Sequence, residues 1–72
     1  GLIEDFNWPA WREILLRSAA LAEERAIFTV YTQKEAELIA RALQGEGWKA
    51  EVIDNRDGKG IYDQWACLAL RP

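Results

Sequence analysis

Histidine is absent from the 72-residue chain, and cysteine occurs once, as Cys67. Without histidine, a serine or cysteine nucleophile lacks its usual activating base, and the common zinc sites built from cysteine and histidine are excluded. A single cysteine cannot form an internal disulfide, which favours a reducing compartment and predicts a cytoplasmic protein. The sequence therefore predicts a protein that is not an enzyme and that holds neither a metal ion nor another cofactor.

Long apolar runs and a basic charge balance are also lacking. The apolar runs are far shorter than the ~20 residues that span a bilayer, and no signal-peptide pattern is present, so no membrane partner is expected. The formal charge of −3 makes direct nucleic-acid binding unfavourable, because phosphates require a basic patch. Apolar side chains are abundant: half of the residues are hydrophobic and four are tryptophan. Dense packing or oligomerisation would stabilise so small a single domain, which we assign to residues 1–72.

Hydrophobic periodicity divides the chain into two helices and three strands. Asn7 is placed to cap the first helix, and Pro9 fits its first turn. Thr32 and Glu35 form a capping-box pattern at the start of the second helix, and Gly45 is predicted to end it. Period-two alternation with β-branched and aromatic residues predicts the strands. The predicted elements are an irregular lead-in at 1–7, helices at 8–24 and 33–44, and strands at 25–31, 48–54 and 61–71.

The order α-β-α-β-β predicts an α+β fold with a three-stranded antiparallel sheet. The composition of 55–60 is typical of a turn and joins the second and third strands as a hairpin. The second strand alternates and carries charge, which suits an edge, whereas the third is apolar on both faces, which suits the centre. The first strand then lies at the other edge, which gives the spatial order 2-3-1. This arrangement is a split β-α-β unit, a truncated ferredoxin-like fold.

Both faces of this sheet are predicted to be apolar. The face covered by the second helix is expected to carry Ala26, Phe28, Val30, Trp48, Ala50, Val52, Ala66, Leu68 and Leu70. The opposite face is expected to carry Ile27, Thr29, Tyr31, Ile53, Trp65, Cys67 and Ala69. A patch this apolar is unfavourable in water, so we expect either the N-terminal helix or another chain to cover it. The first strand is also an apolar edge without proline, which favours pairing with a second copy.

Residues that could carry chemistry have simpler explanations. Cys67 lies among apolar residues, where a small buried side chain is the ordinary role. Asp54, Asp57 and Asp63 flank the predicted hairpin and could form an acid/base pair, but the segment has the composition of a turn. It departs from the calcium-binding loop at Arg56, and its glycines lack the strand-loop-helix context of a phosphate-binding loop.

Two sets of surface residues are candidates for binding a protein partner. Tryptophan is enriched at interface hot spots, and of the four we expect Trp48 and Trp11 in the core. The protein-binding candidates are Trp8, Trp65, Tyr31, Ile27, Thr29 and Ile53. A candidate acidic surface that mimics nucleic acid comprises Glu35, Glu37, Glu46 and Glu51. The alternative for the acidic set is an ordinary solvated surface.

One part of the chain resembles a known family. The segment 28–37 is followed by Ala42-Leu43 and then by the run Gly-Trp-Lys-Ala-Glu-Val at 47–52. This pattern of strand, acidic-alanine helix and Gly-aromatic strand resembles the ferredoxin-like domain of the RraB-type ribonuclease E regulators, over roughly residues 26–70. The resemblance implies a non-enzymatic protein that binds and restrains an enzyme. It carries over no individual functional residue.

The sequence thus predicts a small non-enzymatic protein-binding module that self-associates as a homodimer. A concrete version is an inhibitor or regulator of a nucleic-acid enzyme. The alternative is a structural or oligomerisation domain of a larger chain, which a free-standing gene would exclude. An enzyme is the third hypothesis, and it would gain support if an activity were lost on changing Cys67 to serine, or Asp57 and Asp63 to asparagine.

Overall fold

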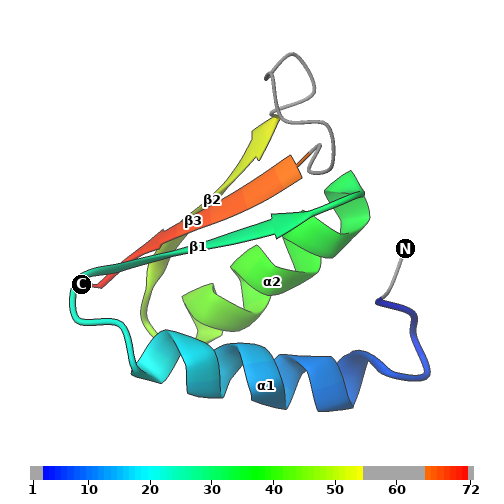
Figure 1. Cartoon of the computed structure of the whole chain (residues 1–72), viewed down its shortest axis with the longest axis horizontal. Coiled ribbons are helices and arrows are strands. Elements are labelled where there is room, and N and C mark those ends of the chain that lie inside the picture. Colours follow the sequence, from blue (N-terminus) through cyan, green and yellow to red (C-terminus); the bar gives the residue numbers. More distant parts are fainter. Residues whose placement is uncertain (1–2, 55–64, 72) are drawn as a thin grey trace.

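Two helices and three strands follow one another in the predicted order (Figure 1). The computed structural model describes residues 3–54 and 65–71, so Asp57, Asp63 and the predicted turn at 55–60 lie outside the described residues. The sheet has the order β1-β3-β2 with both pairs antiparallel, which confirms the predicted topology. The elements are α1 (Trp8–Ala20), β1 (Arg25–Val30), α2 (Gln33–Gly45), β2 (Lys49–Asp54) and β3 (Trp65–Leu70).

The first turn of α2 is fixed by the predicted capping pair. The hydroxyl oxygen of Thr32 accepts a hydrogen bond from the backbone N–H of Glu35 at 3.2 Å. The same hydroxyl donates to the Glu35 carboxylate at 2.8 Å. The second oxygen of that carboxylate accepts from the backbone N–H of Ile3 at 3.2 Å. Ile3 is therefore tied to α2 and belongs to the core, although it was predicted to lie in an irregular lead-in.

Helix α2 extends one residue beyond the prediction, and the glycine that terminates it lies two residues later than predicted. Gly45 is still helical, and Gly47 is the residue with a left-handed backbone, at φ 91°. The backbone N–H of Gly47 donates to the carbonyl of Gln44, and that of Trp48 donates to the carbonyl of Leu43, both at 3.0 Å. These two bonds form a Schellman motif, whose apolar contact joins the third-last helical residue to the residue after the glycine. Here that contact is Leu43 with Trp48, both in the core.

Helix α1 ends four residues earlier than predicted, at Ala20. Its last carbonyls are taken by the side chain of Arg71, which donates from Nη2 to the oxygen of Ala20 at 3.1 Å and from Nε to the oxygen of Ala22 at 2.9 Å. Basic side chains at a helix C-terminus satisfy carbonyls that have no partner within the helix. The residue that caps this end is about fifty positions away in sequence, so helical periodicity alone predicted too long a helix.

Both helices lie on the same side of the sheet. Helix α2 packs on the sheet directly, and α1 packs beside α2 (Figure 1). The core between the layers is formed by Ile39 and Leu43 of α2 together with Cys67 and Ala69 of β3. Among the described residues, no helix covers the opposite face. The structure therefore has two layers, and α1 does not cover the opposite face of the sheet.

The prediction for the two faces of β3 was wrong. The register pairs Phe28 and Val52 with Cys67, so Trp65, Cys67 and Ala69 face the helices, and Ala66, Leu68 and Leu70 face away. A strand that is apolar on both faces carries no period-two signal, and a shift of one residue exchanges its faces. Packing decides between them, because Cys67 and Ala69 are small and allow α2 to lie close to the central strand.

Substituting the two glycines by alanine should have opposite effects. Gly45→Ala adds a methyl group to a helical residue with open space around it, and we expect a gain of about 0.5–1 kcal/mol in the free energy of unfolding. Gly47→Ala places a side chain on a backbone with positive φ, and we expect a loss of about 1–2 kcal/mol. Urea unfolding of the two variants measures both changes. Destabilisation by Gly45→Ala, or no loss in Gly47→Ala, would contradict the assigned helix end.

Candidate functional site

The open sheet face is the surface that the helices leave uncovered. Its side chains alternate with those of the core along all three strands. Ile27 is 64% exposed, Leu70 43% and Ile53 38%. Leu68 is partly buried and Ala66 is buried, and both lie on the central strand. An exposed apolar cluster of this kind is typical of a surface that binds another protein.

Charged residues border this open sheet face at its two edge strands. Arg25 lies at the start of β1, while Lys49 and Glu51 lie on β2, and all three are exposed. A shallow hollow of about 260 Å³ lies between β2 and β3, lined in part by Lys49, Glu51, Leu68 and Leu70. The open sheet face thus combines an apolar centre, a charged rim and the shallow hollow between β2 and β3.

The predicted protein-binding residues separate into groups. Ile27, Thr29 and Ile53 share the open sheet face. Trp65 lies on the helix-facing side of β3, opposite Val30, so it is not part of that face. The two other aromatic candidates lie elsewhere: Tyr31 is half-exposed just after β1, and Trp8 is half-buried and packs against the core from α1. Trp48 is buried as predicted, and Trp11 is half-buried beside the core.

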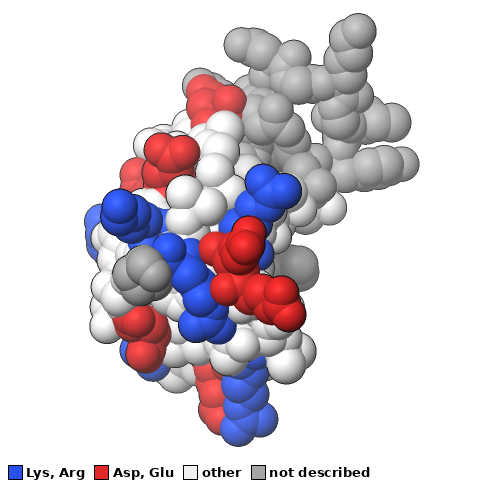
Figure 2. Space-filling view, turned by 90° about the vertical axis from the view of Figure 1, so that its left-hand side faces the viewer, with Lys and Arg blue, Asp and Glu red and all other residues white. Residues whose placement is uncertain are grey.

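The predicted acidic surface is not assembled in the structure. Glu35 is 3% exposed and belongs to the interior, which corrects its placement on the surface. Glu37 accepts a hydrogen bond from Gln33 on α2, Glu46 lies 4.0 Å from Arg12 of α1, and Glu51 is on the open sheet face. Figure 2 shows basic and acidic side chains intermixed on the side of the molecule that it draws. The four glutamates therefore do not form a common surface.

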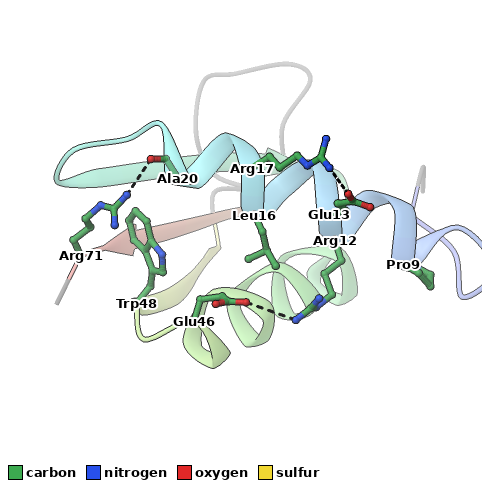
Figure 3. Close-up of a pocket in the computed structure, with 9 residues that line it drawn as sticks. All are labelled: Pro9, Arg12, Glu13, Leu16, Arg17, Ala20, Glu46, Trp48 and Arg71. Carbon is green, nitrogen blue, oxygen red and sulfur yellow. Dashed lines mark hydrogen bonds and ion pairs between the residues drawn. The ribbon is translucent and has the colours of Figure 1, made fainter.

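A cleft of about 580 Å³ lies between α1 and the C-terminal ends of α2 and β3 (Figure 3). Arg71 crosses it, with its guanidinium carbon 4.6 Å from the centre of the Trp48 ring while it donates to the end of α1. Its backbone N–H also donates to the carbonyl of Glu24 at 2.8 Å. The remaining lining comes mainly from α1, and includes Pro9, Arg12, Glu13, Leu16 and Arg17.

The arginines of this cleft already have partners within the protein. Arg17 donates to Glu13 at 2.6 Å, Arg12 lies near Glu46, and Arg71 binds backbone carbonyls. An anion would have to displace these contacts, so the cleft is better explained as a structural clamp than as a phosphate site. The sequence did not identify Arg71, because nothing in its local pattern shows that it reaches α1.

Cys67 has no exposed surface and is a core side chain. Burial raises the pKa of its thiol to about 11, so the thiol is protonated at neutral pH. Among residues 3–54 and 65–71, no three histidine, cysteine, aspartate or glutamate side chains are placed to hold a metal ion. Within the same residues, neither helix has the length and apolar character needed to cross a membrane.

Comparison with known proteins matched no family model, no curated protein and no solved structure.

Removing the Arg71 side chain should destabilise the protein more than removing another arginine. Arg71→Ala loses the hydrogen bonds to Ala20, at the end of α1, and to Ala22 just beyond it, together with the contact with the Trp48 ring, and we expect a loss of about 1–2 kcal/mol. The matched control is Arg17→Ala, whose exposed pair with Glu13 should contribute less than about 0.5 kcal/mol. Chemical denaturation measures both. Equal effects of the two changes would show that Arg71 does not clamp α1.

The buried thiol should make stability depend on alkaline pH. The unfolded thiol ionises near pH ~8.5 and the folded thiol only near pH 11, so between these values the unfolded state binds fewer protons. The Cys67 thiol should therefore not affect the free energy of unfolding below pH ~8. Above that pH it should lower the free energy of unfolding by at most about 1.4 kcal/mol per pH unit. Urea midpoints of wild type and Cys67→Ala between pH 7 and 11 test this. An identical alkaline slope in both proteins would contradict the assignment.

Proposed function

We propose that this chain is a small non-enzymatic protein-binding module, and that it associates with a second copy through the open sheet face. The observation that carries the proposal is the cluster of exposed Ile27, Ile53 and Leu70 on a sheet that has helices on its other side. An apolar centre with a charged rim is the usual anatomy of a protein interface.

A second copy fits this face because the face is self-complementary. Ile27 protrudes from β1, and the hollow beside Leu68 lies on the other side of the central strand. A two-fold axis along β3 would place each Ile27 over the partner's hollow, since a two-fold interface joins one patch to its own copy. The same rotation brings β1 over the partner's β2, with Ile27 level with the partner's Glu51 and Arg25 level with the partner's Lys49, because each of these pairs shares one β3 residue in the register.

The area of the open sheet face limits the affinity of this dimer. Three strands of six residues cover an area of about 14 Å by about 20 Å. Stable interfaces bury about 800 Å² on each partner, which is more than a face of this size supplies by itself. We therefore propose a weak dimer that dissociates on dilution, as suits a module that exchanges partners.

The role of the module in the cell is a separate part of the proposal. The resemblance to RraB-type regulators and the truncated ferredoxin-like arrangement support a regulator that binds an enzyme. The acidic balance of the chain is compatible with a nucleic-acid enzyme as that partner. The alternative, an oligomerisation domain, would use the same open sheet face.

Dimerisation should be lost when a charge is placed at the centre of the open sheet face. In Leu68→Lys, two ammonium groups would meet at the two-fold axis, while Glu51 on the neighbouring strand can still pair with the new lysine in the monomer. We expect wild-type protein to show a monomer–dimer equilibrium in sedimentation velocity over a dilution series, and the variant to remain monomeric. Leu21→Lys is the matched control, because Leu21 is exposed at the end of α1 and should not affect dimerisation.

A charge exchange makes the test specific for the proposed orientation. Lys49→Glu should strengthen the dimer, because it places a carboxylate opposite Arg25 of the other copy, and the further change Arg25→Glu should remove that gain. The proposal fails if wild type stays monomeric at the highest concentration reached, or if Leu68→Lys dimerises like wild type. Absence of a gain in Lys49→Glu, or retention of the gain in the double variant, would reject the orientation while retaining the face.

A further inference from the structure

The helix layer is wider than the sheet that it covers. A helix with its side chains is about 10–12 Å across, and neighbouring strands are about 4.8 Å apart. Two adjacent helices therefore span about 20 Å, whereas three strands span about 14 Å. Helix α1 lies on the β1 side of α2, so the excess width is next to β1 (Figure 1).

The apolar side chains of α1 are only partly buried, as expected for a helix layer that is wider than the sheet. Ala19 is the only buried residue that the structure describes in α1, although the helix carries a broad apolar stripe. Trp11 and Leu15 point toward β1 but remain half-buried, and Ile14 is 54% exposed. Part of the apolar surface of α1 thus has no sheet above it.

A groove of about 280 Å³ occupies the space between α1 and the outer edge of β1. Consecutive residues 27–31 line one wall, which places the groove along the edge of the strand rather than on one face. Trp11 and Leu15 line the other wall, and Ile39 of α2 lies at the base. An engineered cavity of about 150 Å³ is known to hold a benzene molecule, so this groove has room for about two large apolar side chains.

The backbone along this edge is available for pairing. Strand β1 pairs with β3 on one side, and alternate N–H and C=O groups of an edge strand point away from the sheet. Among the described residues, none donates to or accepts from this outer edge through its backbone. Strand β1 contains no proline, and its one charged residue is Arg25 at its first position. The devices that usually protect an edge strand are therefore lacking.

Glu35 gives the groove its charge. It lines the groove with a buried carboxylate, and among the described residues no basic side chain lies within salt-bridge distance of it. Its oxygens accept from Thr32 and from the backbone of Ile3, and a carboxylate has about four acceptor positions in all. A cationic group would therefore find both acceptor capacity and a compensating charge at the end of β1.

We infer that β1 and α1 receive an extended segment of a partner protein as a fourth strand. Two side chains at alternate positions of the segment, about 6.8 Å apart, would enter the groove near Phe28 and Val30. These side chains are apolar, and a lysine or arginine of the segment binds Glu35. Backbone pairing supplies affinity in such strand addition, and the pockets for alternate side chains supply specificity.

A second copy does not fit this edge. Two copies related by a two-fold axis would pair their β1 strands antiparallel, with both helix layers on the same side of the joined sheet. Each α1 already lies below the place of the added strand, so the helices of the two copies would overlap. The outer edge of β1 can pair only with a strand that has no helices packed on it. Such a strand is a segment that is extended before binding or becomes extended on binding.

The test uses ¹⁵N-labelled protein and synthetic nine-residue peptides with valine at two alternate positions. One peptide carries a lysine beyond the valines, a second carries glutamate there, and a third has proline where N–H groups would pair with β1. We expect the lysine peptide to shift the amide signals of residues 26–31 and the indole signal of Trp11. The glutamate peptide should bind at least about ten-fold more weakly, because it loses a charge-assisted hydrogen bond.

Two pairs of variants separate the groove from other surfaces. Glu35→Gln should remove the preference for lysine over glutamate, and Glu37→Gln, on the exposed side of the same helix, should leave it unchanged. Leu15→Glu should abolish binding of the lysine peptide, and Leu21→Glu should not. Repeating the titration with Leu68→Lys keeps the result independent of the proposed dimer, because Leu68 does not line the groove.

Several results would overturn the inference. Equal binding of the lysine and glutamate peptides would remove the role of Glu35, and equal binding of the proline peptide would exclude strand addition. Shifts confined to residues 49–53 and 66–70 would place the peptide on the open sheet face. Shifts of residues 26–31 on raising the concentration of protein alone would identify a second copy as the occupant. Absence of binding by all three peptides at about 1 mM would reject the site.

Discussion

The close approach of α2 to the central strand is the contact on which the other elements depend. Cys67 and Ala69 have no exposed surface, and their small side chains leave room for Ile39 and Leu43 above them. Larger residues there would lift the helix and open the interior on both sides. The same contact decides which face of β3 is inside, and so places Leu68 and Leu70 on the open sheet face. A packing requirement of two small residues thus determines the composition of the exposed surface.

Most of the fold could be predicted because its signals are local. The capping pair of Thr32 and Glu35, the alternation of β2 and the apolar character of β3 each depend on neighbouring residues, and together they gave the strand order. The end of α2 was misplaced because two glycines lie close together, and only the backbone geometry shows that Gly47 adopts positive φ. The residue that follows Gly47 is Trp48, and this apolar partner of the Schellman motif was the available signal.

The candidate site was less predictable, because it depends on contacts between distant parts of the chain. Ile27, Thr29 and Ile53 were correctly grouped, since β1 and β2 alternate. Trp65 was misplaced with the faces of β3. Glu35 was taken for a surface residue, yet the backbone of Ile3 covers it, 32 positions away in sequence. No periodicity could show that α1 lies beside α2, because the apolar stripe of α1 would fit the open sheet face equally well.

The clamp at Arg71 has a consequence for the order of folding. The bonds from Arg71 to the carbonyls of Ala20 and Ala22 join positions 51 and 49 residues apart in a chain of 72. Contacts of such long range form late, because the loop that they close has a large entropic cost. The pairs of β1 with β3 span a comparable range, but the packing of α2 on the sheet stabilises them, whereas α1 has little buried surface of its own. Helix α1 is therefore expected to dock last, and its amide hydrogens should exchange with solvent through openings that leave the sheet intact.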